Sequence, residues 1–193
     1  MILTGYEIGR LVEAGRITID PFCPHQIQPN SYDFRLGETL LIPTDPLVDV
    51  RKPSQMVALR LPSSGYVLSP NTLYLGCSHE RMGSRDFVAQ IFAKNTVASL
   101  GLFIHLAAPL SHLGSVSQWT LELHAVQPLV VYPGMLVGQI TFWVPVGEPC
   151  RYIGKYANDK GPVASRIHEE FITASDDMCR EHDDDPNRPT NPE

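Results

Sequence analysis

Glu122 is the residue whose position most favours catalysis. It lies within Trp119–His124, a run in which polar and apolar residues alternate. The period of two places its side chain on the strand face opposite Leu121 and Leu123. A carboxylate on a rigid, partly buried strand is a candidate general base. The same spacing fits a solvent-facing glutamate on a half-exposed sheet, so spacing alone leaves both interpretations open.

A second group of polar side chains interrupts the otherwise apolar run from Ile91 to His105. Lys94, Asn95, Thr96 and Ser99 lie in the middle of this run. They offer a cation, an amide and two hydroxyl groups within six residues. Such a group is typical either of a turn between two buried strands or of a binding site.

Basic residues also recur in the segment from Gly154 to Arg166. Lys155, Lys160 and Arg166 lie there among glycines. Lysine and arginine bind phosphate oxygens, and glycines allow a segment to move, so this segment could close over a phosphate as a lid. A solvated C-terminal loop has the same composition.

The sequence gives little support for a zinc site. His168-Glu169-Glu170 contains the H-x-E pattern of zinc deaminases, but the P-C-x-x-C segment that completes such a site does not occur. The cysteines, Cys23, Cys77, Cys150 and Cys179, form no C-x-x-C pair. We therefore expect free thiols and no metal bound by protein side chains.

The elements that must position these residues are mostly strands. One helix is expected at the start, because Thr4 and Glu7 form a capping box and Gly15 is a natural stop. Turn signals then recur about every 8 to 12 residues, and 17 prolines and 14 glycines disfavour long helices. The pattern predicts an all-β sandwich or jelly roll. The expected strands are 66–68, 73–76, 87–92, 102–105, 119–123, 129–131 and 138–143.

Length and charge suggest one domain with a tail. A chain of 193 residues with 43% hydrophobic and 19% charged residues is ordinary for a globular protein. Much of the net charge of −6 comes from the C-terminal segment that ends DDDPNRPTNPE. We predict a domain over residues 1–170 and a disordered acidic tail over 171–193. A near-neutral body with an acidic tail argues against nucleic-acid binding.

No apolar run approaches the roughly 18 residues that a membrane span needs. Glu7 and Arg10 interrupt the first apolar residues, so no signal peptide is expected. The prediction from these features is a cytoplasmic protein with no membrane partner.

Four segments in order resemble the dCTP deaminase family, which belongs to the dUTPase superfamily. They are Gln28–Gly37, Leu121-Glu122, Tyr132–Gln139 and Gly154–Arg166. The resemblance covers roughly residues 1–170. It implies a distorted jelly roll of the dUTPase-like (beta-clip) type, with a short N-terminal helix. It also implies a homotrimer with active sites at subunit interfaces, and metal-free hydrolytic deamination of a pyrimidine deoxynucleotide. Mg²⁺ would accompany the nucleotide phosphates, without zinc.

The resemblance also implies roles for particular residues. Glu122 matches the catalytic glutamate that activates water. Ala107 and Ala108 match the backbone that faces the base. Lys155 and Tyr156 match the closing segment, in which Lys155 aligns with a phosphate-contacting lysine. Asp159 stands where a phosphate-binding glutamine is common, and an acid near phosphates is unfavourable unless a cation intervenes.

The departures from the family concentrate between Ala93 and Gly101. The family pattern there is approximately G-R-S-S-x-x-R-x-G. Lys94 keeps the charge of an arginine but loses its planar fork. Asn95 and Thr96 keep hydrogen-bonding ability and would orient the water or the substrate. Ser99 replaces an arginine near the catalytic glutamate, which is expected to alter the electrostatics around Glu122.

Three hypotheses follow. The first is a deaminase that converts dCTP to dUTP or acts on a related nucleotide, with Glu122 and Asn95 as catalytic residues and Lys94, Thr96 and Ser99 in the substrate site. The second is a non-catalytic nucleotide-binding or regulatory protein on the same trimeric scaffold. The third is an interaction protein with a vestigial pocket. A dUTPase-like phosphohydrolase is a less favoured variant of the first, because His112 replaces a family aspartate.

Overall fold

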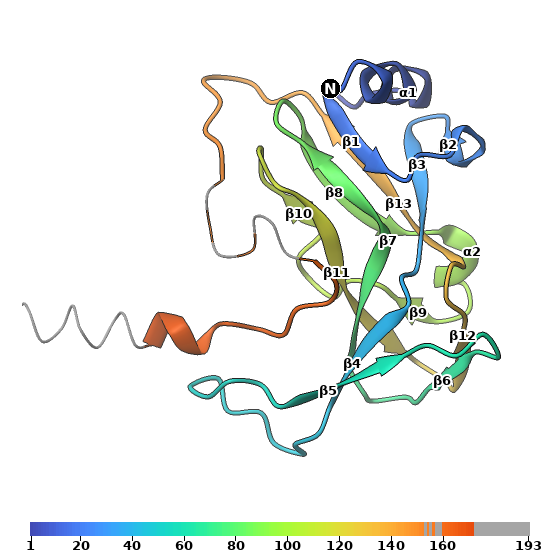
Figure 1. The fold of residues 1–193 in the computed structure, drawn as a ribbon, viewed down its shortest axis with the longest axis vertical. Helices are drawn as coiled ribbons and strands as arrows, with labels where there is room; N and C mark the ends of the chain where they lie inside the picture. The colour runs from blue at the N-terminus through green and yellow to red at the C-terminus, as the bar shows by residue number, and fades with distance from the viewer. Residues whose placement is uncertain (153, 155, 157–159, 172–193) are drawn as a thin grey trace, which may run out of the picture. The chain divides into compact units, whose positions relative to one another are not determined.

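The structure is a computed structural model that describes residues 1–152, 154, 156 and 160–171 (Figure 1). The chain divides into two compact units. The first comprises Met1–Ile42 and Val57–Val163, and the second comprises Pro43–Met56 and the residues from Ala164 onward. The predicted tail lies, apart from Phe171, outside the described residues, so the boundary predicted after residue 170 stays a prediction.

Strands dominate the described chain. The labelled helices are α1 (Gly5–Glu13), the 3-10 helix η1 (Pro24–Gln26) and α2 (Asn95–Ala98), and residues 168–171 are also helical. The first strands are β1 (Ile17–Asp20), β2 (Ile27–Gln28), β3 (Ser31–Arg35), β4 (Thr39–Pro43), β5 (Met56–Arg60), β6 (Tyr66–Leu68) and β7 (Tyr74–Ser84). The remaining strands are β8 (Val88–Ala93), β9 (Leu102–Phe103), β10 (Leu110–Ser111), β11 (Val116–Ala125), β12 (Leu129–Val131) and β13 (Leu136–Trp143). No described helix is long and apolar enough to cross a membrane.

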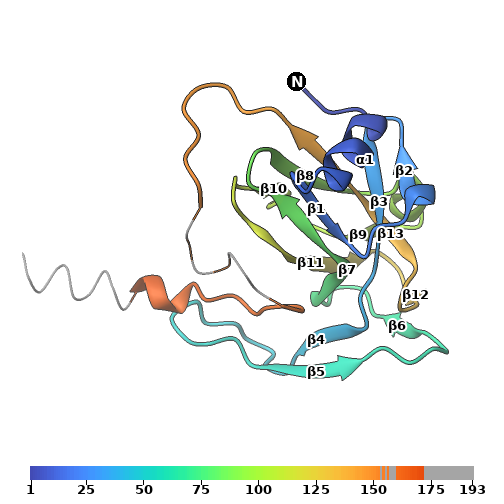
Figure 2. The same cartoon turned by 45° about the horizontal axis from the view of Figure 1, so that its top comes forward.

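The strands form antiparallel sheets, which confirms the all-β prediction. A six-stranded sheet has the order β5-β4-β7-β11-β9, and β1 also pairs with β7. A five-stranded sheet has the order β10-β8-β13-β3-β2, and β12 pairs with β6. Both views show the long strands β7 and β11 side by side (Figures 1 and 2). This central pair carries Glu122 and joins it to the rest of the sheet.

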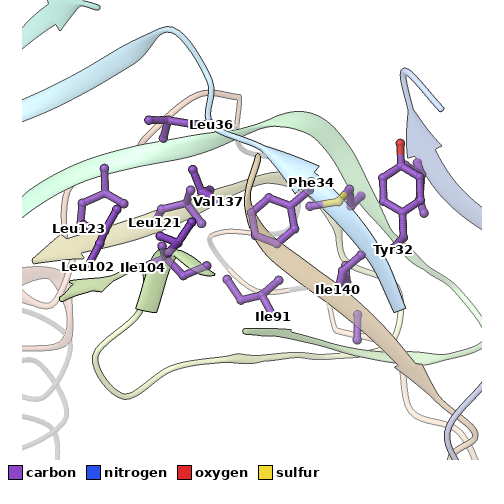
Figure 3. Close-up of a cluster of buried hydrophobic side chains, with 14 of the residues drawn as sticks. Tyr32, Phe34, Leu36, Ile91, Leu102, Ile104, Leu121, Leu123, Val137 and Ile140 are labelled. Carbon is purple, nitrogen blue, oxygen red and sulfur yellow. The ribbon is translucent and has the colours of Figure 1, made fainter. Parts of the chain in front are cut away.

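The core forms where the apolar faces of the two larger sheets meet (Figure 3). Phe34 and Ile140 come from the five-stranded sheet, and Leu121 and Leu123 come from the six-stranded sheet; each is fully buried. A fully buried side chain of this kind contributes roughly 1.5–3 kcal/mol of transfer free energy. Because Leu121 and Leu123 face this core, the alternate residues of β11 face away from it.

The N-terminal helix begins where the sequence predicts. The Thr4 hydroxyl accepts a hydrogen bond from the Glu7 backbone N–H at 3.4 Å, as a capping residue does. Ile8 and Leu11 are buried, so the apolar face of α1 packs on the core. Gly15 follows the helix with a positive φ of 68°, a conformation that glycine adopts without strain.

Strand β7 runs further than the sequence predicts. The expected strand ended at Gly76, whereas β7 continues to Ser84 through a polar run that includes Glu80. The Glu80 side chain has no exposed surface, yet its carboxylate accepts hydrogen bonds from the Arg35 Nε–H at 2.6 Å and from the Arg35 backbone N–H at 2.8 Å. The Glu80 hydrogen bond raises the pKa of Arg35 above its ordinary value. Paired charges of this kind allow a polar run to continue a buried strand.

Candidate functional site

Glu122 lies half-buried on β11, with its backbone and its side chain both bound to the chain that follows β9. Its N–H donates to the Ile104 carbonyl at 2.9 Å. Its carboxylate oxygen Oε2 accepts a hydrogen bond from the Leu106 N–H at 2.7 Å. One carboxylate oxygen is therefore positioned by a backbone N–H, and the strand backbone at Glu122 is bound to the same segment, as a positioned acid or base requires.

The loop beside Glu122 contains the two alanines predicted to face a base. Ala107 and Ala108 directly follow Leu106, and both are exposed. The hydrogen bond from Leu106 to Glu122 fixes the start of this exposed stretch. The structure thus brings Glu122 and Ala107–Ala108 together, although they are more than ten residues apart in sequence.

The polar run between Ile91 and His105 is neither a strand nor a simple turn. It forms the short helix α2, in which Asn95 and Thr96 are exposed. The Ser99 hydroxyl donates to the Asn95 carbonyl at 2.6 Å, so this side chain closes the helix against its own backbone. Ser99 itself is exposed. The helix leads directly into β9, and Phe103 of β9 pairs with His124 of β11.

Lys94 precedes α2 and is the best anchored residue of this run. Its backbone N–H donates to the Val137 carbonyl at 3.0 Å, and its ammonium group forms an ion pair with the Asp33 carboxylate. The sequence predicted Lys94 as a substrate-binding cation but gave no partner for it. Asp33 is 61 positions away and was not singled out, because nothing local in the sequence links the two residues.

Two histidines flank Glu122 and were also not predicted. His124 lies two residues further on β11, and its ring centroid is 6.2 Å from that of Phe103. His105 lies between the two residues whose backbones bind Glu122, and its ring packs edge-on to Phe92 at 6.4 Å. The alternation of β11 places Thr120, Glu122 and His124 on the same half-buried face.

The C-terminal part of the predicted closing segment lies along this same face of β11. The Gly161 N–H donates to the Gln118 side-chain oxygen at 2.9 Å. The Val163 N–H donates to the Thr120 hydroxyl oxygen at 3.1 Å. Thr120 and Glu122 are alternate residues on the strand, so residues 161–163 run next to the candidate base. Sequence spacing alone could not separate this arrangement from a free loop.

The remaining predicted residues of that segment are placed only in part. Tyr156 is half-buried. Lys155 and Asp159 lie outside the described residues, so their predicted contacts with phosphate stay predictions. Among the described residues, no group of three or more histidine, cysteine or acidic side chains is arranged to hold a metal ion. His112, the replacement for a family aspartate, packs its ring against Tyr152 at 5.3 Å.

Known proteins resemble this chain over most of its length. The family model described as dCTP deaminase-like matches residues 2–144. The dCTP deaminase of Rhodopirellula baltica is 37% identical over 172 residues, which cover 89% of this chain and 86% of that protein. The "dCTP deaminase, dUMP-forming" of Clostridium beijerinckii is 36% identical over 172 residues, which cover 89% of this chain and 99% of that protein.

A solved structure shows the same fold. The 2'-deoxycytidine 5'-triphosphate deaminase of Agrobacterium tumefaciens superposes with a TM-score of 0.59 at 22% sequence identity. The match covers 75% of this chain and 48% of that chain, so this chain corresponds to about half of its length. The dUTPase-like fold predicted from the sequence is thereby confirmed. Together with the family match over residues 2–144, these relatives establish that the chain belongs to the dCTP deaminase-like family.

Proposed function

We propose that the protein deaminates dCTP by hydrolysis, with Glu122 as the general base. The observation that carries this proposal is the carboxylate of Glu122, which accepts the Leu106 N–H at 2.7 Å beside the exposed residues Ala107 and Ala108. Family membership and the names of relatives that match over almost their whole length support the same activity.

The reaction needs one group that moves protons. In the proposed step, Glu122 accepts a proton from a water molecule as the water oxygen bonds to C4 of cytosine. The proton then passes to the amino group, the C4–N bond breaks, and ammonia leaves the uracil product. The backbone at Ala107 and Ala108 would face the base, while the exposed side chains of Asn95 and Thr96 would orient the water or the substrate. Ser99 would line the same side of the site.

The nucleotide phosphates would lie toward the closing segment. Residues 161–163 run beside the Glu122 face of β11, so Tyr156 and Lys155, a few residues earlier, are the proposed contacts. Asp159 would need a cation between its carboxylate and a phosphate, because like charges repel. We propose Mg²⁺ on the phosphates in this role, carried in with the nucleotide. A cytoplasmic homotrimer is the proposed setting of the reaction.

The central test is ammonia release from dCTP. The wild-type protein should release ammonia, and Glu122→Gln should reduce the rate by about 100-fold or more, since a positioned general base contributes at least that much. Glu38→Gln is the matched control, because Glu38 is an exposed glutamate whose partner is Arg60. Pyrophosphate is measured in the same samples, since relatives are named dUMP-forming.

Two results would contradict the proposal. Ammonia release by Glu122→Gln at the wild-type rate would remove Glu122 from the mechanism. Thermal stabilisation by cytosine nucleotides without any ammonia release would support the non-catalytic alternative instead. The names of the relatives do not favour that alternative. Nor does the exposure of Asn95, Thr96, Ala107 and Ala108 favour a vestigial pocket that has packed shut.

A further inference from the structure

Lys94 joins three strands and a helix at a single residue. It follows directly on β8, and its N–H donates to the Val137 carbonyl of β13 at 3.0 Å. Its own carbonyl accepts the N–H groups of Val97 and Ala98, each at 2.9 Å, which begins α2. Its side chain reaches Asp33 on β3. Lys94 therefore ties the start of α2 to the five-stranded sheet, while Val97 of α2 packs in the core.

Asp33 is an unusual partner because it is a buried acid. Its side chain is 3% exposed, whereas the side chain of Lys94 is 23% exposed. The carboxylate oxygen Oδ2 accepts hydrogen bonds from Lys94 Nζ and from the Gln28 side-chain amide, the latter at 3.1 Å. The other oxygen, Oδ1, is buried without a hydrogen-bond partner. The negative charge of Asp33 thus depends on Lys94 for most of its compensation.

This dependence decides between two roles for Lys94. The Lys94 ammonium group has three N–H donors, and one of them binds the Asp33 carboxylate. A lysine that moved to a phosphate and gave up this contact would have to turn its ammonium group away from Asp33. That movement would leave a buried carboxylate unpaired, which is among the most destabilising changes a fold can undergo. A contact with a solvated phosphate would contribute much less free energy than the buried pair loses. We therefore expect Lys94 to keep its contact with Asp33 when a nucleotide binds.

We propose that Asp33 is a positioning residue of the nucleotide site. This inference rests on the proposed function. Its buried carboxylate holds Lys94, and Lys94 holds the start of α2, so the exposed side chains of Asn95 and Thr96 are presented in a fixed place. Lys94 is then an anchor for the site, and the nucleotide is bound by the residues that follow it.

A double-mutant cycle tests this role. Asp33→Asn, Lys94→Met and the double variant are compared with wild type in two measurements: the melting temperature without nucleotide, and kcat and KM for dCTP. Each single variant should melt lower and should raise KM by about tenfold, because it leaves one charge without its partner. The double variant removes both charges, so its melting temperature should lie near that of wild type. Because it also lacks the anchor, its KM should stay about tenfold above that of wild type.

Matched variants separate an anchor from a general loss of structure. Lys94→Arg keeps the charge and should melt like wild type. Arg60→Met removes the cation of the exposed Arg60–Glu38 pair and should change neither measurement. If Asp33→Asn does not fold, the comparison of Lys94→Met with Lys94→Arg and Arg60→Met still tests whether Lys94 is an anchor. A melting temperature for Lys94→Met as high as that of Arg60→Met would overturn the proposal.

Two further outcomes would also overturn it. If Asp33→Asn lowers KM while Lys94→Met raises it, then Lys94 is a phosphate ligand that Asp33 merely restrains. Additive changes in melting temperature would show that the two residues do not depend on each other. The melting temperatures are measured without nucleotide, so they test the anchor even if wild type releases no ammonia, a result that would count against the proposed function alone.

Discussion

Glu80 shows how much the environment of one carboxylate matters. Its side chain is fully buried and receives two hydrogen bonds from Arg35, whereas the side chain of Glu38 is 54% exposed in its pair with Arg60. Taking two charges out of water is costly, and only close pairing offsets the cost. The two pairs use the same residue types, so they differ in burial and in the number of hydrogen bonds that the carboxylate accepts.

Removing the charge of Glu80 should therefore destabilise the fold. Glu80→Gln leaves the guanidinium of Arg35 without its carboxylate and should lower the free energy of unfolding by about 3 kcal/mol. Glu38→Gln should change it by less than about 0.5 kcal/mol. Urea denaturation of both variants measures the difference. Equal stabilities for the two variants would show that the buried pair contributes no more to the free energy of unfolding than the exposed pair.

Tyr32 should make stability depend on pH in the alkaline range. Its side chain is buried, and burial raises the pKa of its hydroxyl to about 12, above the ordinary value of 10. The neutral hydroxyl stabilises the fold fully below pH 10, and this contribution disappears as pH rises to about 12. The expected loss is about 3 kcal/mol for a shift of this size.

The measurement is the free energy of unfolding from pH 9 to pH 12 in Tyr32→Phe and in Tyr6→Phe. Tyr6 is 83% exposed, so its variant should keep the full alkaline decline of the wild type. Tyr32→Phe should show a smaller decline, although it starts from a lower stability because the Cys23 N–H loses its acceptor. Parallel curves for the two variants would contradict the assigned cause.

At the scale of elements, local signals predicted local structure well. Thr4 and Glu7 lie within one turn, so the capping box alone placed the start of α1. The second half of β7 could not be predicted, because its polar residues are tolerated only through partners such as Arg35, 45 positions away. Strand β3 was missed for a related reason, since it is buried on both faces and includes Asp33.

The candidate site, too, could be predicted from the sequence only in part. The alternation of β11 and the family resemblance singled out Glu122 from the sequence. The contacts that fix it come from Ile104 and Leu106, and the contact that fixes Lys94 comes from Asp33. Such contacts depend on how strands are ordered in two sheets, and neither composition nor spacing encodes that order locally.

The contact between β11 and the C-terminal segment gives a prediction for these elements. Thr120→Val removes the oxygen that accepts the Val163 N–H, one alternate position from Glu122. If this segment covers the bound nucleotide, KM for dCTP should rise about fivefold, the equivalent of one hydrogen bond. Thr18→Val on β1 is the control and should leave KM unchanged. A wild-type KM in Thr120→Val would separate the segment from nucleotide binding.

At the scale of the whole molecule, the surface near Glu122 carries exposed apolar side chains, which is unusual for a surface that faces only water. Phe103 and Leu106 are each about half exposed in the single chain. Phe103 lies on β9, at the edge of the six-stranded sheet, and Leu106 binds Glu122 through its backbone. Exposed apolar groups that gather beside a site are typical of surfaces that another protein covers.

The homotrimer proposed above supplies such a cover, and it makes activity depend on assembly. Sedimentation equilibrium should give a mass of about 64 kDa, three times the 21.4 kDa of one chain. Phe103→Asp places a charge in the apolar surface and should shift the protein toward monomers, with kcat/KM for dCTP falling as the trimer dissociates. Val57→Asp, at another exposed apolar position, should change neither mass nor activity. A wild-type monomer with full activity would show that one chain completes the site, and the exposed apolar residues beside Glu122 would then need another partner.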